Sequence, residues 1–169
     1  GVGKPVMAHR KPVFSGGPVM IPQDNDEFNS TELGLQWQWH ANHQEDWFTL
    51  SDRAGYLRLH SRYHGGDDLS LAPNMLLQKF PSMKFSVATR MKLEDGYGNL
   101  HAGLVVMGMN YAALDVRRID SVYRIRYLLA GKSVGEMDFR DATVTLKVRV
   151  AEGGICRFGI ATADEPFHQ

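Results

Sequence analysis

Hydrophobic and polar residues alternate along much of the chain, in short runs with a period of two. In each run one face is apolar and the other polar, as half-buried antiparallel strands require. The runs cover residues 33–40, 56–60, 84–93, 111–117, 123–129, 143–150 and 156–160. No window repeats its apolar residues with the period of a long helix. The pattern therefore predicts an all-β chain of about ten short strands.

Turns rich in glycine separate several of these runs. They lie at residues 95–99, 130–132 and 152–154. Glycine supplies the positive φ angles that tight hairpins need. Short strands at hairpin spacing predict a jelly-roll β-sandwich of two antiparallel sheets.

The first 22 residues differ from the rest. Their prolines and the Gly16-Gly17 pair favour an extended linker. The linker is too apolar for a free tether, so we expect it to lie against a partner surface. Residues 23–169 then form the sandwich. The last run has no return strand before the chain ends, so we expect the sandwich to lack its last strand or strands and the chain to be a piece of a longer polypeptide.

Charge and composition exclude several classes of protein. Lys and Arg number 19 and Asp and Glu number 19, so the formal net charge is zero. A general nucleic-acid binder carries a basic excess, and a membrane helix needs about 20 consecutive apolar residues. Neither feature occurs, so no nucleic-acid or membrane partner is expected. Cys156 is the only cysteine, which excludes an intrachain disulfide and a cysteine-based zinc site.

Acidic residues and histidines give no strong sign of a catalytic or metal site. A glycosidase needs two carboxylates across a cleft, one of them in a setting that raises its pKa. The acidic pairs of this chain all lie in polar segments, so no catalytic residue is predicted. The histidines lack the spacing of a zinc site. Residues 24–26 offer oxygen ligands without the full spacing of a calcium loop, so we expect no cofactor, with a structural Ca²⁺ as the alternative.

Surface chemistry concentrates in one long loop and a few tyrosines. The stretch from Ser61 to Asp68 is polar, hinged by glycine and longer than packing requires. The three tryptophans fit core packing better than sugar stacking, whereas tyrosines at loop tips and strand starts fit a surface that meets a sugar ring or a protein. The candidate residues that face a carbohydrate or a neighbouring domain are Tyr63, His64, Asp67, Asp68, Tyr97, His101, Tyr111 and Arg117.

One string of residues is specific enough to indicate a family. Leu-Gly-Leu-Gln-Trp-Gln-Trp, residues 33–39, resembles the opening of the C-terminal sandwich in glycoside hydrolase family 43. The segments 55–59, 76–80 and 102–104 also fit that family, and the resemblance covers essentially the whole chain. It implies a concanavalin A-like β-sandwich appended to a five-bladed catalytic propeller, as in β-xylosidases and α-L-arabinofuranosidases. Residues 1–22 are then similar to the linker that leaves the catalytic domain in those enzymes. The catalytic carboxylates of that family belong to the propeller, so none is assigned here.

The resemblance implies a noncatalytic accessory domain. We expect it to pack on the propeller of the same polypeptide and to shape a pocket for xylo- or arabino-saccharides, with loop 61–74 as the candidate that reaches the pocket. The alternative is an independent, lectin-like module that binds xylan- or arabinan-derived oligosaccharides near Tyr97, His101, Tyr111 and Arg117. A structural or oligomerisation domain is a third interpretation. A bacterial periplasmic or extracellular location is favoured over the cytoplasm.

Overall fold

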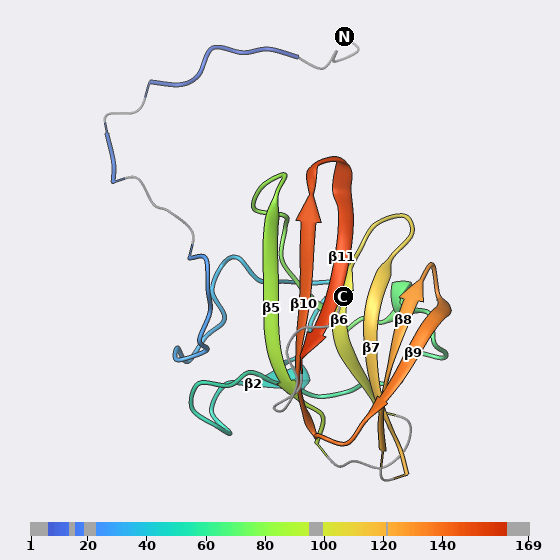
Figure 1. Ribbon diagram of the computed structural model, residues 1–169. Coiled ribbons are helices and arrows are strands. Elements are labelled where there is room, and N and C mark those ends of the chain that lie inside the picture. Colours follow the sequence, from blue (N-terminus) through green and yellow to red (C-terminus); the bar gives the residue numbers. More distant parts are fainter. Residues whose placement is uncertain (1–6, 14–15, 19–22, 95–99, 121, 162–169) are drawn as a thin grey trace.

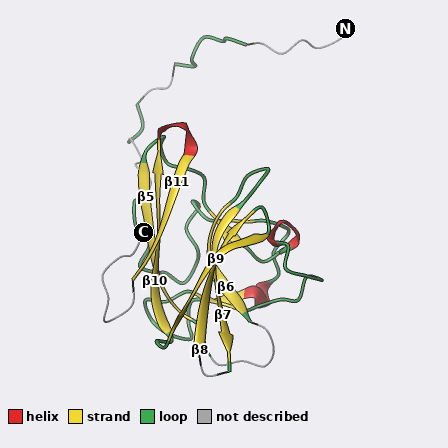
Figure 2. Cartoon of the chain, turned by 45° about the vertical axis from the view of Figure 1, so that its right-hand side comes forward, coloured by secondary structure: helices red, strands yellow, loops and turns green. Residues whose placement is uncertain are grey.

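Two antiparallel sheets packed face to face form the body of the molecule (Figures 1 and 2). The computed structural model describes residues 7–13, 16–18, 23–94, 100–120 and 122–161. One sheet has the strand order β11-β10-β5, and the other has the order β6-β7-β8-β9. The all-β class and the sandwich predicted from the sequence are confirmed.

Seven long strands build the two sheets. The three-stranded sheet contains β5 (Phe85–Lys92), β10 (Thr143–Ala151) and β11 (Ile155–Ala161). The four-stranded sheet contains β6 (His101–Val106), β7 (Ala112–Ile119), β8 (Val122–Leu129) and β9 (Lys132–Phe139).

Shorter elements lie before and between the long strands. β1 (Gln38–Trp39) pairs with β4 (Leu76–Leu77), and β2 (Phe48–Thr49) pairs with β3 (Arg58–Leu59). The 3₁₀ helices are η1 (Glu45–Trp47), η2 (Leu69–Leu71) and η3 (Glu152–Gly154). No helix in the described ranges is long and apolar enough to cross a membrane.

The larger of two hydrophobic clusters lies between the two sheets. Leu146 of β10 is completely buried, and Val116 of β7 is almost as well buried. Both belong to a cluster that also includes Leu114, Ile125 and Ile160, so both sheets contribute to it. Alternating residues of the two inner faces therefore interdigitate, as the period-two pattern requires.

The turns predicted at 130–132 and 152–154 are confirmed. Ala130 and Gly131 both have positive φ, at 47° and 78°, in the hairpin between β8 and β9. Gly153 and Gly154 have φ of 79° and 76° between β10 and β11. Tight hairpins need positive φ angles of this kind, which glycine adopts without a steric penalty. The turn predicted at 95–99 lies outside the described residues.

The prediction of a strand over residues 33–40 is wrong for most of its length. Only Gln38–Trp39 is a strand, and the Trp37 amide closes a turn by donating to the Gly34 carbonyl at 3.1 Å. The Asp26 carboxylate accepts hydrogen bonds from the side chains of both Gln36 and Trp37. Neighbouring side chains of a strand point to opposite faces, so this shared acceptor is incompatible with a strand.

Two other predictions concern the ends of the chain. Met7 and Val13 are exposed, and the described residues of the linker, 7–13 and 16–18, hold no helix or strand. Contact of the linker with another surface stays a prediction. The C-terminal segment in which a last strand would be missing, 162–169, lies outside the described residues.

Candidate functional site

The loop of residues 61–74 is tied together at its base. The Asn74 side chain donates a hydrogen bond to the His60 carbonyl at 3.0 Å. The His60 amide donates to the Trp47 carbonyl at 2.8 Å, and the His40 amide donates to the Met75 carbonyl at 3.0 Å. Both ends of the loop are therefore fixed to the body of the domain. A loop with closed ends is typical of compact functional loops.

The middle of the loop is attached to the outer face of the four-stranded sheet. The Leu69 amide donates a hydrogen bond to the Tyr111 hydroxyl at 3.3 Å. Tyr111 is the residue that precedes β7. The Asp67 carboxylate lies 3.7 Å from Arg117 of β7 and 3.8 Å from Arg126 of β8. The loop therefore contacts this sheet through a backbone group and a charged side chain.

Asp68 caps the short helix η2 inside the loop. Its carboxylate accepts hydrogen bonds from the hydroxyl and the amide of Ser70, at 2.8 and 2.9 Å. These two bonds lower the pKa of Asp68. Asp68 therefore shapes the loop locally, as side-chain caps do.

Tyr111 was expected on the surface, and the structure corrects this. Its side chain is only 5% exposed and packs with Ala113, Leu128 and Leu69. The ring lies on the sheet and is covered by the loop, and the hydroxyl accepts the hydrogen bond from the Leu69 amide of the loop. A tyrosine with an apolar body and a polar tip suits this junction. Tyr111 is therefore an anchor for the loop and is not available to stack on a sugar.

Asp115 is the centre of a charged cluster beside the loop. It is 4% exposed, and its carboxylate accepts hydrogen bonds from Arg126 at 2.6 and 2.9 Å. His101 Nδ1 lies 3.1 Å from the same carboxylate, and an Arg117 nitrogen lies 3.5 Å from it. The strand register brings these side chains together. Arg126 stands directly opposite Asp115, and His101 stands directly opposite Arg117.

The electrostatics of this cluster oppose acid catalysis. Burial by itself raises the pKa of Asp115, but the hydrogen bonds from His101 and Arg126 and their charges outweigh it and lower the pKa overall. A glycosidase acid needs the opposite shift. The cluster therefore fits a role in holding strands and loop together. His101 and Arg117 were predicted from the sequence, whereas Asp115 and Arg126 were not, because their only signal is opposite charge at facing strand positions.

Tyr63 is the most exposed large hydrophobic side chain of the loop. Its side chain is 94% exposed. The neighbouring Arg62 is bound to the carbonyl and the carboxylate of Asp46. His64 Nε2 is buried and makes no hydrogen bond within the described part of the chain. Tyr97 lies outside the described residues.

The eight predicted site residues therefore have different surroundings. Asp67, His101 and Arg117 come together around Asp115, whereas Asp68 and Tyr111 shape and anchor the loop. Of the residues expected to meet a sugar near Arg117, Tyr111 is covered, and His101 is half-buried against Asp115.

The segment considered for calcium is organised by hydrogen-bond donors. Asp26 accepts from the Phe28 amide at 2.9 Å, the Gln36 side chain at 3.0 Å and the Trp37 indole at 2.7 Å. Donors of this kind suit a carboxylate that fixes a turn. Among the described residues, no three His, Cys, Asp or Glu side chains are grouped so that they could hold a metal ion.

Comparison with known proteins identifies the family. Residues 25–168 match the family described as the beta xylosidase C-terminal concanavalin A-like domain. A beta-xylosidase of Formosa agariphila is 36% identical over 75 residues, which are 44% of this chain and 12% of that protein. A putative beta-xylosidase of Xylanibacter ruminicola is 35% identical over 108 residues, 64% of this chain and 20% of that protein.

Solved structures show the same fold. A variant of the GH43 protein BlXynB from Bacillus licheniformis superposes with a TM-score of 0.73 at 21% identity, covering 85% of this chain and 29% of that one. The xyloglucan PUL GH43B protein of Bacteroides ovatus gives a TM-score of 0.68 at 18% identity, covering 92% and 32%. This chain thus spans less than a third of each of these relatives. It belongs to the family of C-terminal concanavalin A-like domains of glycoside hydrolase family 43 β-xylosidases.

Proposed function

We propose that this chain is a noncatalytic accessory domain that packs on the catalytic propeller of its own polypeptide and shapes the substrate pocket. The polypeptide then acts on xylo- or arabino-saccharides. The observation that carries the proposal is the exposure of Tyr63, at 94%, on a loop that is anchored on both sides. The family supports it, because the compared relatives are mostly made of chain outside the matched region.

The anchors give the loop the rigidity that a pocket wall needs. The base is closed by Asn74 on His60, and the second half is held by Asp67 and Leu69 on the sheet. Tyr63 lies between these attachments. Because the anchors order the loop in advance, less conformational entropy is lost when it meets the propeller. An exposed tyrosine then offers a flat face for a pentose ring and a hydroxyl for a hydrogen bond.

Replacing Tyr63 in the full polypeptide tests the pocket-shaping role. For Tyr63→Ala, we expect kcat/KM on nitrophenyl xyloside or arabinofuranoside to fall about three- to tenfold, the equivalent of losing one aromatic contact. The melting temperature should not change, because the side chain packs on little within the domain. Initial-rate kinetics and thermal melts of purified protein provide both measurements.

Met83→Ala is the matched control. Met83 is also an exposed large side chain, but it precedes β5 of the other sheet. Its replacement should leave kcat/KM unchanged. Equal kinetics for the Tyr63 variant and the parent enzyme would contradict the pocket-shaping role. Turnover by the 169-residue chain alone, retained through repurification, would contradict the noncatalytic assignment.

A further inference from the structure

The outer face of the three-stranded sheet is strongly basic. Side chains of β10 alternate between the core, with Leu146 and Val148, and this outer face. The three strands contain no Asp or Glu. Their outward positions carry five cations, namely Arg90, Lys92, Lys147, Arg149 and Arg157.

The strand register arranges these cations as a diagonal stripe. Arg157 of β11 stands opposite Arg149 of β10. Lys147 is the next outward residue of β10, two positions before Arg149. On β5, Arg90 stands opposite Thr145, and Lys92 opposite Thr143. The stripe crosses all three strands and is about 20 Å long, from the rise per residue and the strand spacing.

Small side chains of the described strands flank the stripe. Lys147 stands between Gly159 and Ala88 in the ladder, and Arg149 has Ser86 on its β5 side. None of the outward positions of these strands is aromatic. Within the described strands, no bulky or aromatic side chain therefore stands between the cations of this face.

Three arginines of the stripe have no ion partner. Arg90, Arg149 and Arg157 are exposed, and no ion pair or side-chain hydrogen bond involves them within the described ranges. On the opposite sheet, Arg124 is paired with Asp138 and Arg126 with Asp115. The formal net charge of zero therefore does not reveal that three arginines on one sheet are unpaired, whereas Arg124 and Arg126 on the other sheet are paired.

Two of the unpaired arginines face each other across the ladder. Arg149 and Arg157 are direct cross-strand neighbours. Like charges in this position destabilise a sheet. An anion bound between them removes the repulsion, and a guanidinium binds a carboxylate through two parallel hydrogen bonds.

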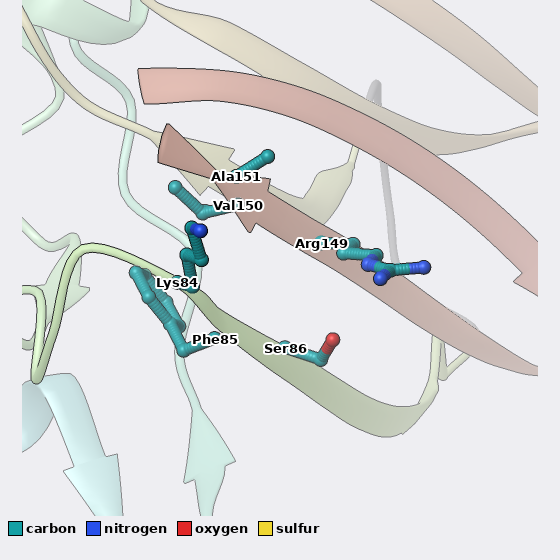
Figure 3. A pocket seen from close by; sticks show the side chains of 6 residues that line it. All are labelled: Lys84, Phe85, Ser86, Arg149, Val150 and Ala151. Atoms are coloured by element: carbon teal, nitrogen blue, oxygen red, sulfur yellow. The ribbon is translucent and has the colours of Figure 1, made fainter. Parts of the chain in front are cut away.

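A cleft adjoins the Arg149 end of the stripe (Figure 3). Its volume is about 270 Å³, and it is lined by Lys84, Phe85, Ser86, Arg149, Val150 and Ala151. Lys84 is paired with Glu152 at 3.0 Å, which leaves Arg149 as the cation of the cleft without a carboxylate partner. Ser86 adds a hydroxyl on the neighbouring strand.

We propose that this basic face binds a polysaccharide that carries carboxylate groups, such as a uronate-substituted xylan chain. The choice of sugar rests on the proposed function, whereas the preference for an anion rests on the sheet alone. A linear chain fits a strip of this length, with its carboxylates on the unpaired arginines and one of them beside the cleft. Nucleic acid is the weaker fit, because the face has no aromatic residue for base stacking and the chain has no overall basic charge.

Binding of matched polysaccharides tests the proposal. The probes are glucuronoxylan and the same xylan after chemical reduction of its carboxyl groups, titrated into the 169-residue chain at low and at physiological salt. We expect the reduced xylan to bind at least about tenfold more weakly, and added salt to weaken glucuronoxylan binding.

A charge-matched pair of variants locates the surface. The triple variant Arg90→Gln, Arg149→Gln, Arg157→Gln should lose about tenfold or more in affinity for glucuronoxylan. The control removes three positive charges elsewhere, by Arg10→Gln, Lys79→Gln and Lys132→Gln, and should stay within about twofold of the parent chain. Circular dichroism verifies that both variants are folded.

Four results would overturn the proposal. They are equal binding of native and reduced xylan, unchanged binding by the arginine variant, tighter binding of a DNA duplex than of glucuronoxylan, and loss of glucuronoxylan binding in the full polypeptide. The kinetics of the Tyr63 variant do not enter this test, so the proposed pocket function can fail or hold independently of it.

Discussion

At the scale of single residues, Asp115 is the most consequential charged group of the described structure. It is buried and neutralises Arg126, with His101 and Arg117 beside it. For Asp115→Ala, we expect the free energy of unfolding at pH 7 to fall by about 3–5 kcal/mol, because a buried pair loses one partner and leaves cations together. Urea denaturation of the two proteins measures this difference.

The difference in unfolding free energy between the wild-type protein and Asp115→Ala should depend on pH. The folded state lowers the pKa of Asp115 below its ordinary value, about 3.9. The unfolded chain therefore binds the proton more readily, and the stabilisation is complete above about pH 4. It is lost as the pH falls through the lowered pKa of the folded state, so the gap between the wild-type protein and Asp115→Ala should narrow in acid.

Asp138→Ala is the control for this prediction. Asp138 accepts two hydrogen bonds from Arg124, at 2.6 and 2.9 Å, but this pair is exposed to solvent. Solvent screens such pairs, so the urea midpoint should hardly move. Equal effects of the two substitutions would show that burial of Asp115 contributes nothing.

At the scale of elements, two strand glycines distinguish tight from open packing. A Cβ atom on Gly103 of β6 would come 1.9 Å from the Leu114 carbonyl oxygen of β7, whereas a Cβ atom on Gly135 of β9 would meet nothing within 4 Å. Gly103→Ala should therefore destabilise the chain by about 1–3 kcal/mol, because backbone must move. Gly135→Ala should be neutral or slightly stabilising.

Thermal melts of these two variants decide the point. The substitution is the same in both, so propensity and entropy effects of alanine largely cancel. A melting temperature for Gly103→Ala equal to that of Gly135→Ala would mean that β6 and β7 separate at no cost.

Strands that alternate cleanly were predictable from the sequence, and those without alternation were not. β10 was predicted at 143–150 and runs from Thr143 to Ala151, because its core and solvent faces differ at every step. β9 was missed, since it is exposed at all positions but Phe139 and has little apolar pattern to show. At residues 33–40 a strand was predicted but most of the segment is not one. The Asp26 carboxylate accepts hydrogen bonds from adjacent side chains there, which favours a turn.

The site was predictable only in part, for a related reason. The long polar loop was visible because its length and glycines exceed what a hairpin needs. Its attachment to Tyr111 and Arg117 depends on which sheet the loop crosses, and that is fixed by tertiary packing. The stripe of cations on the three-stranded sheet could not be predicted from a net charge of zero, because their alignment depends on the register of β5, β10 and β11.

At the scale of the whole molecule, the two sheets should unfold as one unit. Leu146 of β10 has no exposed surface and belongs to the cluster that includes Val116 and Ile125 of the facing sheet. Leu146→Ala should therefore lower the free energy of unfolding by about 2–5 kcal/mol through lost burial and a residual cavity. Amide hydrogen exchange should show the same loss of protection in β7 and in β10, because both depend on one core. Leu35→Ala, at a fully exposed position, should change the protection of neither strand.

Loss of protection in β10 while β7 stays protected would instead mean that the two sheets open separately. The four-stranded sheet would then hold the loop of residues 61–74 without support from the three-stranded sheet.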